Sequence, residues 1–306
     1  YYSIEKEAPM TFSPDAEYPL VNTEKGRFPG HFTAGFEASD ALPRLVSIKA
    51  GTKVNVVPGK AKAAVEGFEM VALEKAAAET KEETGISFEF AAEGTVTEIT
   101  ATGIGAHAST PDVGNNALTG LLVFLGKLDF ASCPQVDMVR KTASLFPHGD
   151  VNGKTLGVAM EDELSGNLTL SFNMLSVDAA SMDGEFDGRI PVCGNDENVL
   201  EVVRARMAEQ GLTLLNKALI PPHHVSADSY FVKTLLAAFE LYTGRKGECQ
   251  ALGGGTYVHH LENGVAFGAA MPETDNKMHG PDEFAVVDEL LVSAKIFAQT
   301  IVDLCG

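Results

Sequence analysis

The sequence has few basic residues, few cysteines and no long apolar run, and each shortage excludes a class of protein. Lysine and arginine number 23 against 42 aspartate and glutamate residues, which gives a formal net charge of −19. This charge argues against nucleic acid or an anionic membrane as a partner. No run of 18 apolar residues is present, so we expect no transmembrane helix. An acidic surface of this kind is most simply a solubility feature, so it does not name a substrate.

The four cysteines lie far apart without a Cys-x-x-Cys pair, which disfavours a zinc site built from them. We expect free thiols in a reducing cytosol, and therefore a cytoplasmic protein. The first six residues contain no basic segment followed by an apolar one, so they are not predicted to be a signal peptide. Because the chain also lacks an initiator methionine, we expect the natural start to lie upstream.

The length of 306 residues suggests about two domains, and the hydrophobic periodicity predicts an α/β protein. Residues 27–222 show strand and helix patterns in a β-rich α+β order, whereas strand–loop–helix units after Ser226 are typical of a parallel layer. The predicted strands are Ala16–Val21, Leu45–Val57 with a break at Gly51, Ser87–Phe90, Thr95–Thr102, Leu168–Ser176, Gly184–Pro191, Cys249–Leu252 and Val265–Gly268. The predicted helices are Gly67–Thr84, Asn115–Leu128, Glu197–Gln210, Tyr230–Tyr242 and Phe284–Leu304.

Three short segments carry side chains suited to metal-dependent hydrolysis. Asp15 follows a proline, where an aspartate is usually a turn residue but could also bind a metal. His279 lies in a loop before a helix, and a neutral imidazole there either packs at the turn or ligates zinc. Glu283 could accept a hydrogen bond from the ring of His279, or complement the helix dipole. His107 is flanked by small residues that would leave its ring exposed to a substrate.

Two further features could bind a ligand. Arg189 ends a predicted strand and could grip a carboxylate with two hydrogen bonds, or lie on the surface. The residues Gly253, Gly254, Gly255 and Thr256 could bring backbone N–H groups close to a ligand, although no Lys-Ser/Thr pair follows as in a phosphate loop. The pair His259-His260 lacks the HExxH spacing of zinc peptidases, and we expect it to lie on a helical surface.

Taken together and in this order, these segments resemble the M20 family of metallopeptidases, most closely its bacterial dipeptidases that act on Xaa-His or carnosine-type substrates. The resemblance runs along the whole chain. Pro-Asp-Ala-Glu-Tyr-Pro and Gly-Gly-Gly-Thr-Tyr are specific to that branch, and Gly-Ala-His-Ala-Ser is shared by the wider family. The other matching segments are Glu24-Lys25-Gly26, Val54–Pro58, Gly188–Pro191, Gly264–Gly268 and Met278-His279.

The resemblance implies a role for each matching residue. Residues 1–26 and 223–306 would form the C-terminal part of an αβα catalytic domain, and residues 27–222 an inserted α+β lid. Asp15 and His279 would each ligate one of two zinc ions, with manganese or cobalt as alternatives. His107 would stabilise the oxyanion from the lid. Asn55, Arg189 and the Gly253–Thr256 backbone would hold the carboxylate end of a dipeptide substrate.

The sequence departs from the family at a decisive place. The family's His-x-Asp segment, bridging Asp and Glu-Glu pair all precede Pro-Asp-Ala-Glu-Tyr-Pro, and none is found here. Glu82-Glu83 lies on the wrong side of that segment and does not substitute. A hydrolytic zinc needs three protein ligands. We therefore expect a truncated enzyme that binds little or no metal and is inactive alone.

Several interpretations stay open on the sequence. The intact protein would be a monomeric dipeptidase, or a cleaved N-terminal segment would remain associated and complete the site in trans. An M20-type deacylase of N-acyl amino acids would share the fold and differ in substrate. A non-catalytic binding or assembly module that pairs subunits through a sheet edge would show no metal and no turnover.

Overall fold

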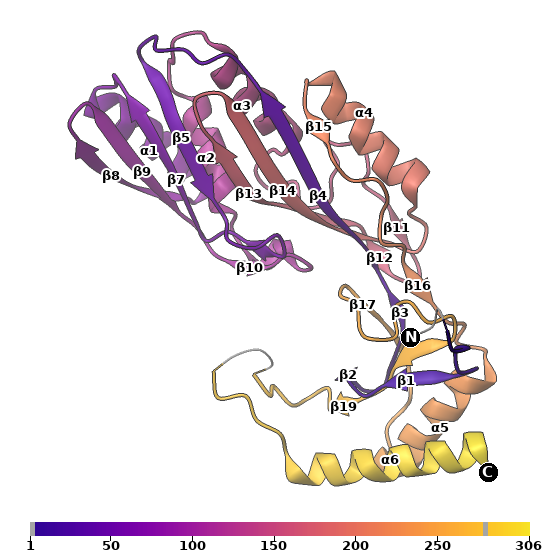
Figure 1. The fold of residues 1–306 in the computed structure, drawn as a ribbon. Coiled ribbons are helices and arrows are strands. Elements are labelled where there is room, and N and C mark those ends of the chain that lie inside the picture. The colour runs from indigo at the N-terminus through magenta and orange to yellow at the C-terminus, as the bar shows by residue number, and fades with distance from the viewer. Residues whose placement is uncertain (1–3, 278–280) are drawn as a thin grey trace. The chain divides into compact units, whose positions relative to one another are not determined.

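The computed structural model describes residues 4–277 and 281–306 and divides them into two compact units. The insert unit comprises Arg27–Glu161 and Asn167–Ile220. The terminal unit comprises Tyr1–Gly26, Asp162–Gly166 and Pro221–Gly306. The mixed α/β architecture predicted from the sequence is confirmed (Figure 1). Each unit has its own hydrophobic core and is described by itself.

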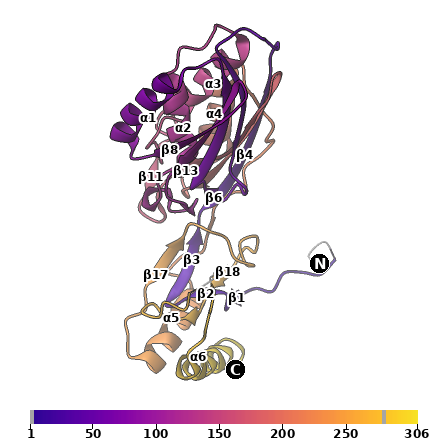
Figure 2. The same ribbon diagram turned by 90° about the vertical axis from the view of Figure 1, so that its left-hand side faces the viewer.

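An eight-stranded sheet forms the insert unit, in the order β15-β4-β14-β13-β5-β7-β9-β8. Alternation of buried and exposed residues, as in β7, places one face of each strand in the core. Helices α1, α2 and α3 cover that face (Figures 1 and 2). The strands are β4 (Gly26–Gly35), β5 (Arg44–Ala50), β7 (Lys60–Glu66), β8 (Ser87–Glu93), β9 (Val96–Thr102), β13 (Thr169–Val177), β14 (Ser181–Ile190) and β15 (Thr213–Leu214). The helices are α1 (Met70–Thr84), α2 (Ala117–Gly126), α3 (Pro134–Leu145) and α4 (Glu201–Glu209).

Local sequence explains where the helices of the insert unit begin and end. The side chain of Asn116 caps α2 by accepting the N–H groups of Leu118 and Thr119. Gly85 ends α1 with φ of 74°, a left-handed conformation that glycine adopts without strain. Leu118, Leu121 and Phe124 of α2 are fully buried against the sheet. The apolar face of α2 therefore fixes its position.

A mixed sheet forms the terminal unit, in the order β1-β18-β3-β16, with β17 paired in parallel to β3. The sheet is not the purely parallel layer expected from the sequence, because β18 and β16 run antiparallel to β3. Its strands are β1 (Thr11–Ser13), β3 (Leu20–Glu24), β16 (His223–His224), β17 (Cys249–Leu252) and β18 (Gly264–Ala266). A second small sheet joins β2 (Ala16–Glu17) to β19 (Ala269–Ala270). Helices α5 (Tyr230–Thr243) and α6 (Val287–Cys305) pack with the sheet in one core.

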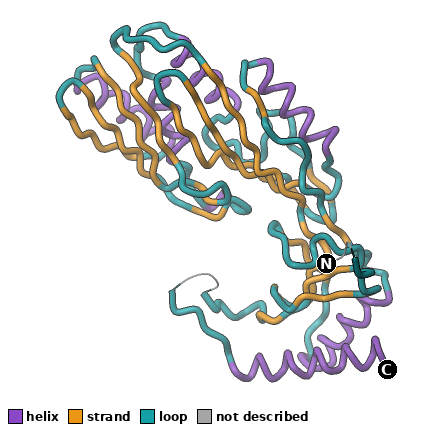
Figure 3. The backbone as a smooth tube through the Cα atoms, in the orientation of Figure 1, coloured by secondary structure: helices purple, strands orange, loops and turns teal. Residues whose placement is uncertain are grey.

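Several elements of the insert unit differ from the sequence predictions. The predicted strand Leu45–Val57 is two strands, β5 and a two-residue β6 (Val56–Val57), because Gly51 turns the chain at φ of 77°. Strands β4 and β7 and helix α3 were not predicted (Figure 3). Three glycines and a proline conceal β4 in the sequence. The smaller elements are β10 (Ala106–His107), β11 (Glu161–Asp162), β12 (Gly166–Asn167), a 3-10 turn (Pro111–Val113) and a π turn (Asp196–Leu200).

Candidate active site

A two-stranded ribbon in the insert unit brings Asn55 and His107 together. Strand β10 pairs antiparallel with β6, so that His107 lies opposite Val56. The backbone carbonyl of Asn55 accepts the N–H of Ala108 at 3.0 Å. Residues 52 positions apart thus share one loop cluster. Both residues were predicted from the sequence as site residues, and in the structure they lie close together at the β6–β10 ribbon.

Ser109 holds the imidazole of His107. The backbone N–H of Ser109 donates to Nδ1 at 3.2 Å, and the Ser109 hydroxyl lies 2.6 Å from the same nitrogen. An N–H donor can only point at an unprotonated ring nitrogen. The proton of the neutral ring is therefore assigned to Nε2. The side chain of His107 is exposed.

Arg189 is buried rather than on the surface. Only 5% of the residue is exposed, and Nε and Nη2 donate to the two oxygens of Asp187 at 2.5 and 3.0 Å. Burial raises the pKa of Asp187 by more than the hydrogen bonds and charge of Arg189 lower it, with smaller opposing effects from His107 and Arg27. The sequence predicted the arginine but not its carboxylate partner, since Asp187 stands in an unremarkable strand pattern.

A polar chain supports the loop that carries Asn55. The amide of Asn173 donates to the carbonyl of Val54 at 2.5 Å, and the hydroxyl of Ser171 donates to Asn173 at 2.5 Å. Asn173 is fully buried, and Ser171 is 4% exposed. Both belong to β13. The sheet thereby fixes the chain immediately before Asn55.

In the terminal unit, Asp15 lies at an exposed bend between β1 and β2. It makes no hydrogen bond or ion pair with the other described residues. The second predicted metal ligand, His279, lies outside the described residues. Glu283, its predicted partner, is exposed. The pairing of His279 with Glu283 stays a prediction.

The loop Gly253–Thr256 follows β17 and is held by Glu24 at the end of β3. Both carboxylate oxygens of Glu24 accept the backbone N–H of Thr256, at 3.1 and 3.2 Å. The hydroxyl of Thr256 donates to the same carboxylate at 2.6 Å, and Nδ1 of His259 lies 2.7 Å from it. Glu24 is 1% exposed. Thr256 is thus occupied by Glu24 and does not offer its N–H to a ligand.

The prediction that His259-His260 lies on a helical surface is wrong for His259. The two residues lie in a turn, and His259 is 5% exposed. Nε2 of His259 lies 2.9 Å from the carbonyl oxygen of Pro221. The partner Glu24 stands 235 positions earlier in the sequence, so no local spacing could reveal the contact. Only the pairing of β3 with β17 brings the two segments together.

The described residues do not supply a metal site. Within residues 4–277 and 281–306, no group of three or more His, Cys, Asp or Glu side chains is arranged to hold a metal ion. Asp15 offers a single carboxylate, which is fewer donors than a zinc site requires. No chemical step is therefore assigned to a metal on these residues.

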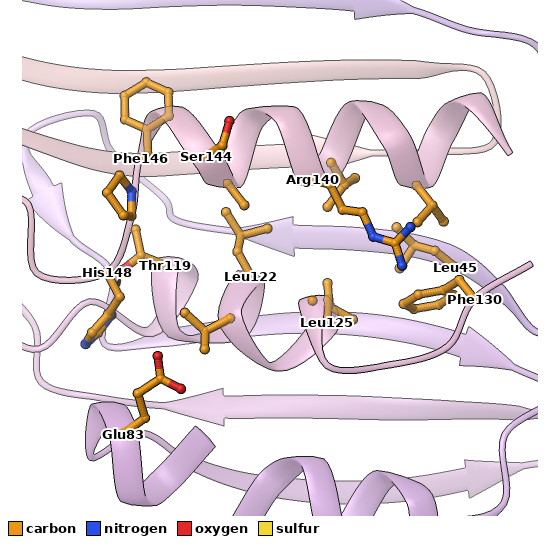
Figure 4. Close-up of a pocket in the computed structure, with 16 residues that line it drawn as sticks. Leu45, Glu83, Thr119, Leu122, Leu125, Phe130, Arg140, Ser144, Phe146 and His148 are labelled. Atoms are coloured by element: carbon orange, nitrogen blue, oxygen red, sulfur yellow. Dashed lines mark hydrogen bonds between the residues drawn. The ribbon is translucent and has the colours of Figure 1, made fainter. Parts of the chain in front are cut away.

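An apolar cavity of about 420 Å³ lies beside α2 and α3 in the insert unit, and no predicted site residue lines it. Figure 4 shows Glu83 and His148 at one end and Arg140 with Phe130 at the other. Nδ1 of His148 lies 2.9 Å from the hydroxyl of Thr119, and burial lowers the pKa of His148. The polar groups that line the cavity do not converge on one point, as those of a catalytic site must. We interpret the cavity as a gap in helix packing.

Among the described residues, no helix combines the length and the apolar character needed to cross a membrane. No family model matches the chain. The chain is 34% identical over 314 residues to the Bacillus subtilis (strain 168) protein named "Putative dipeptidase YtjP", and 32% identical over 306 residues to the Beta-Ala-Xaa dipeptidase of Lactobacillus delbrueckii subsp. lactis. Each match covers 99% of this chain, which spans 65% and 64% of these two relatives.

A solved structure is similar to the chain in fold. The aminoacylhistidine dipeptidase of Vibrio alginolyticus superposes with a TM-score of 0.51 and 13% identity, over 97% of this chain and 67% of that one. The sequence matches to the two bacterial relatives run through the predicted site segments in both units. Along nearly its whole length the chain is therefore similar in sequence to bacterial proteins named as dipeptidases, and its fold is similar to that of an aminoacylhistidine dipeptidase.

Proposed function

We propose that a protein carrying this chain, together with the further length found in its relatives, hydrolyses dipeptides. The proposal draws on the sequence match to a Beta-Ala-Xaa dipeptidase along 99% of the chain. The observation that carries it is the hydrogen bonding of His107. The insert unit would act as a lid and the terminal unit as part of the catalytic domain.

His107 would stabilise the negative charge that develops on the carbonyl oxygen of the scissile peptide bond. The N–H of Ser109 fixes the acceptor role of Nδ1, so Nε2–H is the donor that the ring presents. A donor whose orientation is set before the reaction stabilises an oxyanion without reorganisation during the reaction. An exposed position on a short ribbon suits this role.

Asn55 and Arg189 would hold the carboxylate end of the substrate. Asp187 fixes the guanidinium plane of Arg189 through two hydrogen bonds, and the polar chain from β13 fixes the backbone before Asn55. The Gly253–Thr256 loop would bind the same end through backbone N–H groups. This assignment leaves His107 as the group that contacts the reacting carbonyl.

A divalent metal forms part of the proposal because the chain resembles the M20 family, which consists of metallopeptidases. Zinc is the first candidate, and manganese or cobalt are alternatives. The described residues do not hold such an ion by themselves. We propose that the 306-residue chain alone does not hydrolyse dipeptides. Asp15 and His279 would each ligate a metal in a site whose other ligands come from residues outside this chain. A cleaved segment in trans or a longer polypeptide would complete the site equally well.

The experiment compares the 306-residue chain with the product of its complete reading frame. Each is assayed on β-Ala-His, on other dipeptides and on N-acyl amino acids, with zinc, with manganese and after EDTA. We expect hydrolysis of dipeptides by the complete product alone, inhibited by EDTA. In that product, His107→Ala should lower kcat by about 10²–10³-fold, as for loss of an oxyanion donor, with metal content unchanged.

Two outcomes would overturn the proposal. Turnover of N-acyl amino acids without dipeptides would indicate a deacylase, and no turnover of either class by the complete product would favour a non-catalytic module. The matched control for His107→Ala is His31→Ala. His31 lies in the same unit, is half-exposed and interacts with Asp183 at 2.8 Å. Its replacement should leave kcat unchanged.

A further inference from the structure

The hydrogen bonds of the buried Glu24–His259 pair account for two protons. Nε2 of His259 faces the carbonyl oxygen of Pro221, which can only accept, so Nε2 carries a proton. Nδ1 faces a carboxylate oxygen of Glu24 at 2.7 Å, so a second proton lies between these two atoms. The pair therefore has zero net charge. That neutrality makes burial of both side chains, at 2% and 1% exposure, physically acceptable.

The second proton is assigned to the His259 side of the contact. Burial by itself raises the pKa of Glu24, but hydrogen bonds from His259 and Thr256 outweigh it, and the pKa is lowered overall. The ionised form of Glu24 is therefore favoured, and the shared proton is assigned to Nδ1 of His259. Two other imidazoles lie near this ring, with centroid distances of 6.2 Å for His223 and 5.1 Å for His260. His223 is itself engaged, since its Nε2 lies 2.6 Å from the carbonyl of Gly264.

The Gly253–Thr256 loop lies directly against this pair. A Cβ placed on Gly255 would lie 3.5 Å from Nδ1 of His259 and 3.6 Å from an oxygen of Glu24. The backbone N–H of Lys25 donates to the carbonyl of Leu252 at 2.9 Å, which joins the two chain segments immediately before the loop. Lys25 is the nearest cation in sequence, and burial lowers its pKa. Both ends of the loop are therefore fastened to the end of β3.

We propose that Glu24 and His259 are positioning residues that hold the Gly253–Thr256 loop ready for substrate, with Thr256 as the link between the pair and the loop. The N–H groups of Gly254 and Gly255 make no hydrogen bond with other described residues, and they are the donors that the held loop offers. Their ligand is the terminal carboxylate of a peptide. The identity of this ligand rests on the proposed function, whereas the protonation state of Glu24 and His259 does not.

The first test measures the pair in the chain as it stands. Long-range ¹H–¹⁵N NMR of the histidine side chains distinguishes a doubly protonated ring from either neutral tautomer. At pH 7 we expect the His259 ring, assigned by its loss in His259→Gln, to show two protonated nitrogens. A neutral ring in the unmodified chain would overturn the proposal, and this result requires no variant of Glu24 to fold.

The second NMR measurement connects the pair to the loop. In Glu24→Gln the amide resonances of Gly254, Gly255 and Thr256 should shift and broaden, because the loop loses a charged anchor. The matched control is His260→Gln, which changes the adjacent, exposed imidazole and should leave these amides in place. Unchanged loop amides in Glu24→Gln would show that the pair does not position the loop.

The third test uses the complete product, if it hydrolyses dipeptides. A positioning pair for a substrate-binding loop predicts that Glu24→Gln and His259→Gln raise KM at least tenfold while kcat falls much less. His107→Ala should instead lower kcat strongly and change KM much less. An unchanged KM in both variants would overturn the positioning role. Absence of any turnover would instead count against the proposed function, and the NMR results on the pair would stand.

Discussion

Glu24 in the terminal unit and Asp187 in the insert unit are both buried carboxylates paired with a basic side chain, yet their pKa values move in opposite directions. For Glu24, burial raises the pKa, but donors from His259 and Thr256 outweigh it. For Asp187, burial raises the pKa and the bidentate contact with Arg189 does not outweigh it. A salt bridge is therefore not by itself evidence that a buried carboxylate is stabilised as an anion. The additional hydroxyl and backbone donors from Thr256 distinguish Glu24.

The opposite shifts require opposite pH responses. The lowered folded-state pKa of Glu24 adds stability above its unfolded pKa, and this contribution is lost as pH falls through the folded value. The raised folded-state pKa of Asp187 acts the other way. Its contribution is greatest below the unfolded pKa and declines as pH rises through the folded value. Acidification should thus lower the contribution of Glu24 to the free energy of unfolding of the terminal unit. It should raise the contribution of Asp187 to that of the insert unit.

The composition allows the two units to be followed separately. The chain has no tryptophan, and all six tyrosines stand at positions of the terminal unit. Tyrosine fluorescence therefore reports on the terminal unit alone. Hydrogen exchange measured by mass spectrometry follows the β-strands of the insert unit.

The largest expected effect is that of Arg189→Met. Removing the cation leaves the carboxylate of Asp187 buried and unpaired, which destabilises the insert unit by about 3–5 kcal/mol at pH 7. The loss should shrink as the pH is lowered from 7, because the carboxyl group of Asp187, whose pKa is raised, takes up a proton before an ordinary aspartate does. Denaturant-dependent hydrogen exchange of β13 and β14 measures it. The double variant Asp187→Asn with Arg189→Met is the control, and a loss that stays constant as the pH is lowered would contradict the raised pKa.

The next largest effect is that of Glu24→Gln. Replacing the anion with an amide should cost the terminal unit about 1–3 kcal/mol at pH 7, as expected for hydrogen bonds to a charged group. The difference from the unmodified chain should vanish as the pH falls below 4.5, the ordinary value for glutamate, and through the lowered value. Urea unfolding followed by tyrosine fluorescence measures it. A difference that persists undiminished at low pH would mean that Glu24 is not the titrating group.

Local patterns predicted those elements whose own residues specify them. Helix α1 ends at Thr84 as predicted, and α6 starts within three residues of its predicted start, because periodic apolar residues and a left-handed glycine after the helix are local signals. Strand β4 was missed because one of its glycines, Gly30, accommodates a side chain from a distant strand. A Cβ on Gly30 would lie 2.0 Å from the ring of Phe186. A glycine that accommodates an aromatic ring from another strand looks, in sequence, like a turn.

The candidate site divides along the same line. His107, Asn55 and Arg189 stand in short segments whose composition and resemblance marked them. The sequence did not reveal their anchoring partners. Asp187 and Glu24 have no distinguishing local pattern, and only the fold shows that they are buried. His259 was assigned to the wrong environment for that reason. Burial depends on pairing between β3 and β17, which no local spacing encodes.

A smaller effect separates the donors of Glu24 from one another. Thr256→Val removes the hydroxyl donor and keeps the shape of the side chain, so the terminal unit should lose about 1 kcal/mol at pH 7. Thr256→Ser, which keeps the hydroxyl, is the control. The acid transition followed by tyrosine fluorescence should move to higher pH in the valine variant only, since the carboxylate has lost a donor. An identical shift in both variants would assign the effect to packing.

The smallest expected effect belongs to Lys62 and Glu98, which form an ion pair across β7 and β9 at 2.7 Å. Their side chains are 55% and 50% exposed, so water and salt screen the attraction. Lys62→Ala should therefore change the stability of the insert unit by less than about 0.5 kcal/mol, at pH 5 and at pH 7 alike. Hydrogen exchange of β7 and β9 measures it beside Arg189→Met. A loss approaching that of Arg189→Met would show that burial does not set the difference between ion pairs, and the contrast between Glu24 and Asp187 would then need another cause.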